Sequence, residues 1–228
     1  MRPGLVLFCL VLEFIEGRTL KQLLGEGERF SEAEAAAVAR DVLAILTYLH
    51  GLSPPVIHRD IKPSNLMRRP DGRLVLIDFD LVRDVLRPDG GSTVAAGTPG
   101  YAPLEQFIGE AVPATDLYAL GATLTALLSR KEPLDLRAPG SQSIDFGRHV
   151  NVAPAFAAVL EKMLEPDTAN RYRTAQEVLD DLDRPPPPPE PTPPRADDRA
   201  GETAGAQDAR DRSRNYYRAA LAVLAGVV

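Results

Sequence analysis

Hydrophobic and polar positions along the chain predict four helices, and the first of them spans residues 30–51. Apolar side chains recur there at helical spacing, which places them on one face. Ser31 and Glu34 form a capping-box pattern that predicts the start of this helix, and Gly51 can cap its end. The apolar face consists of Val38, Val42, Ile45, Leu46 and Leu49.

The other three helices are predicted further along the chain. Residues 115–129 are apolar around most of the helix circumference, which is typical of a helix buried inside a domain. Residues 153–164 and 174–182 form the remaining two. Thr174 and Glu177 predict a second capping box at the start of the last one.

The segments before and between these helices favour short strands and loops. Residues 4–17 form a short apolar run rich in Val, Leu and Phe, which indicates a buried strand rather than a membrane span. A Pro-Asp-Gly turn signal at residues 70–72 precedes a second strand at residues 73–78. Residues 81–100 are rich in Gly, Thr and Ala, and we expect them to form a long loop.

The character of the chain changes after Arg184. Residues 185–215 begin with a run of prolines and continue with charged residues, so we expect an extended, disordered linker. Residues 216–228 start with aromatic and basic side chains and continue as an apolar run, shorter than the roughly 20 residues that a bilayer requires. This pattern favours the start of a transmembrane helix, and a short amphipathic tail is the alternative.

Composition narrows the classes of function. The 228 residues carry a formal net charge of −6, which argues against a nucleic-acid-binding surface. Cys9 is the only cysteine, so the sequence excludes an internal disulfide and a multi-cysteine zinc site. No charged leader with a small-residue cleavage site accompanies the first apolar run, so we expect no signal peptide.

Six motifs in a fixed order carry a resemblance to a known family. They are LVLEFIEGRTL (10–20), HRDIKPSN (58–65), DFD (78–80), GTPGYAPLEQ (97–106), TDLYALG (115–121) and NRYRTAQEV (170–178). Together they resemble the core of eukaryotic-type serine/threonine protein kinases, as found also in bacteria. The resemblance implies an α+β, protein-kinase-like fold with a mainly α-helical C-lobe and short strands around the catalytic loop. It also implies a kinase domain over residues 1–184 that comprises the hinge and the C-lobe.

The resemblance implies that the loop at residues 58–65 uses ATP and Mg²⁺ to phosphorylate protein Ser/Thr hydroxyls. Asp60 would accept the proton of the attacking hydroxyl, and Lys62 would contact the γ-phosphate. Asn65 and Asp78 would supply the oxygen ligands that Mg²⁺ prefers. An ordinary polar loop is the alternative for these residues.

Other residues are expected to bind adenine or to support the loop by packing. Leu12 would be the gatekeeper of the hinge, and backbone groups of Glu13 and Ile15 would bind adenine. His58 is expected to serve packing and hydrogen bonding, because the family does not use this histidine as a base.

The resemblance also assigns regulatory residues. Arg59 lies next to the catalytic aspartate, and a phosphate on the activation segment could pair with its guanidinium. Ser92 and Thr93 are the expected phosphate acceptors, with plain loop residues as the alternative. Thr98 is expected nearer the substrate, close to the catalytic residues.

Three charged residues are expected to act as structural supports. Glu105 and Arg171 would form a buried ion pair that anchors the activation segment to the lower lobe. Asp116, at the head of the central helix, would hold the catalytic loop by accepting backbone amides.

Two positions depart from the family pattern. Asp80 stands where the family has glycine, whose backbone freedom allows this segment to switch between active and inactive states. Aspartate tolerates unusual φ values better than most residues, so it could stiffen the switch or add repulsion near the phosphates. Leu104 stands where the usual motif has proline.

The largest departure lies at the start of the chain. Protein kinases need a glycine-rich loop and a strand lysine paired with a helix glutamate, whereas no lysine precedes the hinge and Gly4 is the single early glycine. We therefore expect the upper lobe to be absent, and the chain to be a fragment of a longer, membrane-anchored receptor-type kinase or the product of a misplaced start. The kinase domain would then be cytoplasmic, at the inner face of a bacterial membrane.

Two functional classes stay open on this basis. The first is a serine/threonine kinase whose partners are ATP and protein substrates. The second is a degenerate, kinase-like module that binds partners without catalysis. A small-molecule phosphotransferase shares the metal-binding logic, but it gives no reason for GTPGYAP, which shapes a peptide-binding surface in kinases.

A polypeptide of these 228 residues alone is expected to transfer no phosphate, because it lacks the loop that covers the phosphates. Incubation with labelled ATP, Mg²⁺ and a generic protein substrate measures this, with Asp60→Asn as the control. Incorporation that the substitution abolishes would contradict the expectation.

Overall fold

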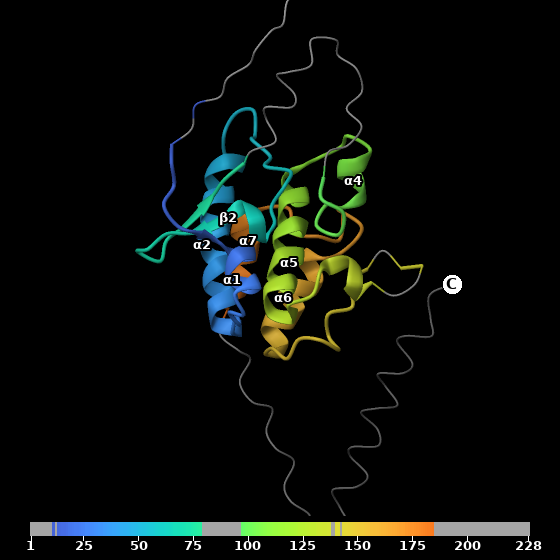
Figure 1. Ribbon diagram of the computed structural model, residues 1–228. Helices are drawn as coiled ribbons and strands as arrows, with labels where there is room; N and C mark the ends of the chain where they lie inside the picture. Colours follow the sequence, from blue (N-terminus) through green and yellow to red (C-terminus); the bar gives the residue numbers. More distant parts are fainter. Residues whose placement is uncertain (1–10, 12, 79–96, 138–139, 142, 185–228) are drawn as a thin grey trace, which may run out of the picture. The chain divides into compact units, whose positions relative to one another are not determined.

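The structure is a computed structural model that describes residues 11, 13–78, 97–137, 140–141 and 143–184 (Figure 1). The described residues all lie in the first of the two units of the chain, Met1–Pro186. The predicted proline-rich linker, the predicted membrane segment and most of the predicted long loop lie outside the described residues.

Four helices form the body of the unit, as the hydrophobic pattern predicts. They are α2 (Glu32–His50), α5 (Pro113–Ser129), α6 (Pro154–Met163) and α7 (Ala175–Leu182). Helix α2 packs against both α5 and α7, and α6 packs against α5 and α7. Every residue of α5 from Ala114 to Leu127 is buried, which confirms the prediction of a central helix covered on all sides.

The predicted cap of α2 is confirmed. The Ser31 hydroxyl accepts from the Glu34 amide, while the Glu34 carboxylate accepts from the Ser31 amide at 2.8 Å. The cap of α7 is confirmed only in part. Thr174 accepts from the Glu177 amide, but the Glu177 carboxylate accepts from the amide of Arg173 at 3.0 Å, one residue ahead of the expected donor.

Three short strands form a small antiparallel sheet. Its strands β1 (Arg18–Thr19), β2 (Leu66–Arg68) and β3 (Leu74–Leu76) follow one another in that order, and Leu66 pairs with Leu76. Gly72 adopts a φ of 86° in the turn between β2 and β3, a conformation that favours glycine. The predicted strand after the turn is therefore confirmed, and it ends directly before the site.

The prediction of a buried strand at residues 4–17 is wrong for the part of that run that the structure describes. Val11 and Phe14 are 88% and 89% exposed, and the first strand begins only at Arg18. A strand needs a neighbour to pair its backbone groups. No described strand pairs with residues 13–16, so their apolar pattern alone forms no ladder.

Several short elements were not predicted. They are α1 (Leu20–Gly25), α4 (Leu104–Phe107) and the 3₁₀ helices η1 (Pro63–Asn65) and η2 (Pro133–Leu136). A capping box of Thr19 and Gln22 starts α1, and this signal is readable in the sequence. Among the described helices, none combines the length and the apolar character needed to cross a membrane.

Candidate active site

The buried carboxylate of Asp116, in the first turn of α5, holds the start of the loop at residues 58–65. Its Oδ2 accepts the amide of His58 at 2.8 Å, and its Oδ1 accepts the amide of Arg59 at 2.9 Å. The ring of His50, at the end of α2, lies 2.9 Å from Oδ2. Asp116 thus makes the backbone contacts that the sequence predicts for it, and one carboxylate joins α2, α5 and the loop.

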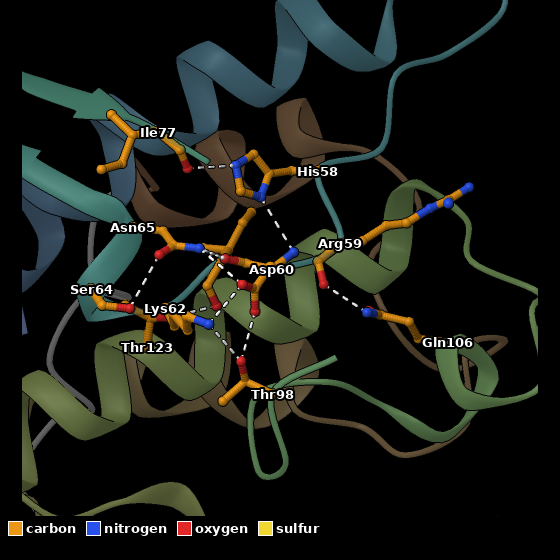
Figure 2. A network of polar contacts seen from close by, with 11 residues as sticks. His58, Arg59, Asp60, Lys62, Ser64, Asn65, Ile77, Thr98, Gln106 and Thr123 are labelled. Atoms are coloured by element: carbon orange, nitrogen blue, oxygen red, sulfur yellow. Dashed lines mark hydrogen bonds and ion pairs between the residues drawn. The ribbon is translucent and has the colours of Figure 1, made fainter. Parts of the chain in front are cut away.

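Asp60, Lys62 and Thr98 form a closed triangle of hydrogen bonds (Figure 2). The ammonium of Lys62 donates to Asp60 Oδ2 and to Thr98 Oγ1, both at 2.7 Å. The hydroxyl of Thr98 donates to Asp60 Oδ1, also at 2.7 Å. The expected closeness of Thr98 to the two loop residues is therefore present.

Asn65 completes the loop from the other side. Its Nδ2 donates to the backbone oxygen of Asp60 at 2.8 Å and to Asp60 Oδ2 at 3.0 Å. Pro63 begins the 3₁₀ turn η1 that brings the two residues together, and its ring presets the backbone for that turn. Asp60 is consequently oriented by Asn65, Lys62 and Thr98.

Asp78 reaches the same region through the β2–β3 hairpin. The amide of Ile77 donates to the backbone oxygen of Asn65 at 2.9 Å, so the residue after the strand lies beside the end of η1. Asp78 is exposed and adopts a φ of 62°, a region that aspartate tolerates. The negative charges of Asp60 and Asp78 both act to raise the pKa of His58, although burial outweighs them.

His58 has the bonding pattern of a neutral imidazole. Its Nδ1 accepts the amide of Asp60 at 3.3 Å, which leaves the proton on Nε2, 3.1 Å from the backbone oxygen of Ile77. Burial lowers the pKa of this ring and outweighs the opposing effect of Asp116. The histidine therefore ties the loop to the end of β3.

The oxygen atoms near this loop suit a hard cation. Asn65 offers an amide oxygen that accepts only the hydroxyl of Ser64, at 3.1 Å, among the described residues. Asp78 offers an exposed carboxylate. Mg²⁺ binds through one or two such oxygens together with substrate phosphates. The two residues therefore fit the metal that the resemblance implies.

The buried ion pair between α4 and the segment before α7 is also present. Arg171 Nη1 lies 2.7 Å from Glu105 Oε1, and the two side chains are 0% and 12% exposed. The guanidinium also donates to the backbone oxygens of Ala114, Glu165 and Pro166.

Sequence reasoning missed two polar residues that brace the loop. Gln106 Nε2 donates to the backbone oxygen of Arg59 at 2.6 Å. Thr123 Oγ1 lies 3.3 Å from the backbone oxygen of Ile61 and shares its one proton with the backbone oxygen of Ala119, at 2.8 Å. Gln106 ends the motif at residues 97–106, and Thr123 lies two residues after the motif at residues 115–121. Neither residue has a local signal that identifies its partner.

Of the remaining predicted residues, the structure describes two and leaves four outside the described ranges. Glu13 and Ile15 lie in a non-regular segment that leads into β1. Leu12, Asp80, Ser92 and Thr93 lie outside the described residues, so their roles stay predictions.

The fold and the geometry of the loop agree with the resemblance to protein kinases, and comparison with known proteins supports it. Residues 6–182 match the protein kinase domain. The chain is 40% identical over 189 residues to serine/threonine-protein kinase B of Synechocystis sp., covering 78% of this chain and 33% of that protein. It is 39% identical over 184 residues to serine/threonine-protein kinase PknA of Nostoc sp., covering 77% and 32%.

A solved structure shows the same fold. The crystal structure of the Mycobacterium tuberculosis PknI kinase domain superposes with a TM-score of 0.60 at 23% identity, covering 75% of this chain and 63% of that one. The chain therefore belongs to the protein kinase family, with bacterial eukaryotic-type serine/threonine kinases as its relatives. It spans about a third of the length of the curated relatives it matches.

Replacing Arg171 with methionine is expected to lower the free energy of unfolding by about 3–5 kcal/mol, because it leaves a largely buried carboxylate unpaired. Glu105→Gln is expected to cost less, since the guanidinium keeps its three backbone acceptors. Urea unfolding of the purified chain measures both values.

The exposed Arg173, two residues along the chain, supplies the matched control for this experiment. Arg173→Gln is expected to change stability by less than about 0.5 kcal/mol. A loss below about 1 kcal/mol for Arg171→Met would show that the ion pair does not anchor this part of the lobe.

Proposed function

We propose that this chain supplies the catalytic loop of a serine/threonine protein kinase that uses ATP and Mg²⁺. The observation that carries the proposal is the hydroxyl of Thr98, which donates to Asp60 at 2.7 Å while Lys62 contacts both. A side-chain hydroxyl already occupies the position from which a Ser or Thr substrate would deliver its proton to the carboxylate.

Each residue of the loop then has a chemical role. Asp60 accepts the proton of the attacking hydroxyl, and Asn65 fixes the orientation of that carboxylate through its side-chain amide. Lys62 stabilises the negative charge of the transferred group, since its ammonium already lies within hydrogen-bond distance of Asp60 Oδ2 and Thr98 Oγ1. The hydroxyl of Thr98 yields its place to the substrate.

Asn65 and Asp78 would hold the magnesium ion, which neutralises phosphate charge when bound. Glu13 and Ile15 would bind adenine through their backbone groups. Arg59 would pair with a phosphate on Ser92 or Thr93 and so couple loop geometry to phosphorylation. Attachment to the inner face of a membrane through residues 216–228 is the corresponding proposal for localisation.

A chimeric enzyme tests the role of this loop directly. Residues 6–182 of this chain would replace the matched segment in the Synechocystis kinase B, which supplies the rest of the polypeptide. The chimera is expected to phosphorylate Ser or Thr in a protein substrate. Asp60→Asn is expected to reduce the rate by about 10²–10⁴, the usual contribution of a general base.

The chimera with Arg173→Gln serves as a control and is expected to keep its rate. A folded chimera that binds ATP but transfers no phosphate would favour the binding-module alternative. Full activity in the Asp60→Asn chimera would remove Asp60 from the proposed mechanism.

A further inference from the structure

A cavity of about 410 Å³ opens directly beside the triangle of Asp60, Lys62 and Thr98. Lys62 and Thr98 form one of its walls, α1 contributes a second, and the end of α5 with the following turn contributes the third. Lys21, Arg130, Lys131 and Glu132 supply its other charged side chains. The cavity is large enough for more than one side chain and shares its wall with the proposed phosphotransfer site.

The charge of this cavity is opposite to that of the chain. Four cations and one carboxylate line it, which gives a formal net charge of +3, whereas the whole chain carries −6. A cleft lined by one sign of charge attracts the opposite sign and raises its local concentration. The lining therefore selects for a negatively charged occupant.

The cations of the cavity are largely uncompensated. Lys62 pairs with Asp60, but within the described residues neither Lys21 nor Arg130 takes part in an ion pair. Among the described residues, the ammonium of Lys131 has one hydrogen-bond partner, the Nδ1 of His149 at 3.3 Å. These side chains therefore keep hydrogen-bond donors for an anionic group.

The single carboxylate of the lining is partly engaged. The buried phenol of Tyr101 donates to Glu132 Oε2 at 3.0 Å. Burial raises the pKa of Tyr101, and Glu132 raises it further, so the phenol keeps its proton and remains a donor. Glu132 therefore opposes an anionic occupant less than a carboxylate with no donor would.

We propose that this cavity binds an acidic side chain of the protein substrate, close to the Ser or Thr that receives the phosphate. The acidic side chain would form ion pairs with Lys21, Arg130 and Lys131. The kinase would then select substrates whose phosphorylated Ser or Thr lies in an acidic sequence. The inference rests on the proposed function, because it takes the triangle of Asp60, Lys62 and Thr98 as the place of the acceptor hydroxyl.

Peptide binding to the 228-residue chain tests the cavity without requiring catalysis. The probes are fluorescent peptides with one threonine flanked by glutamates, by glutamines or by lysines, and anisotropy gives the dissociation constants. The glutamate peptide is expected to bind most tightly, with a preference that weakens as salt is added. The double variant Lys21→Gln, Arg130→Gln is expected to weaken that peptide about tenfold and to leave the glutamine peptide unchanged.

Two further variants separate this inference from the proposed function. Arg173→Gln removes an exposed cation outside the cavity and is expected to keep the preference. Asp60→Asn is also expected to keep it, because the cavity cations remain. A preference for glutamate in a chain whose chimera transfers no phosphate would refute the proposed function alone.

Three results would overturn the inference. They are equal binding of the glutamate and glutamine peptides to the unsubstituted chain, tighter binding of the lysine peptide, and a glutamate preference that survives in the double variant. The last result would place the acidic residue elsewhere on the protein.

Discussion

The buried carboxylate of Asp116 is the constraint on which the site depends. A charge taken out of water costs free energy unless hydrogen bonds satisfy it, and the amides of His58 and Arg59 supply two of them. The same bonds hold Arg59 at a φ of 70°, which non-glycine residues rarely adopt. The helix that carries Asp116 is buried on all sides, and the loop is hydrogen-bonded to this well-packed helix.

Three segments far apart in the sequence meet around that support. The ring of His58 contacts the backbone of Ile77, and the backbone of Asn65 accepts from the same residue, which fixes the end of β3 to the loop. Thr98 and Gln106 tie the segment before α5 to the loop from the opposite side (Figure 2). The chemistry of the site is therefore a consequence of tertiary hydrogen bonds rather than of the loop alone.

Local signals predict the helices well, because their spacing and caps are encoded within a few residues. The capping box of α2 and the uniform apolar character of α5 are both present in the structure. The strand expected at residues 4–17 fails where it is described, since strand formation depends on a partner that the segment itself does not specify. The order of the motifs predicted that the loop residues lie close together. It did not predict the contacts of Gln106 and Thr123 with backbone oxygens of the loop, because these partners lie 47 and 62 positions away in the sequence.

We propose that Asp116 holds the loop so that Asn65 and Asp78 share one cation. NMR spectra recorded during addition of Mn²⁺ and ATP measure this, because the paramagnetic ion broadens only nearby signals. The signals of the side-chain amide of Asn65 and the backbone amide of Asp78 are expected to broaden together. In Asp116→Asn, one oxygen must serve donors that two oxygens served before, and the joint response should be lost. Independent broadening in the unsubstituted chain, or an unchanged joint response in the variant, would contradict it.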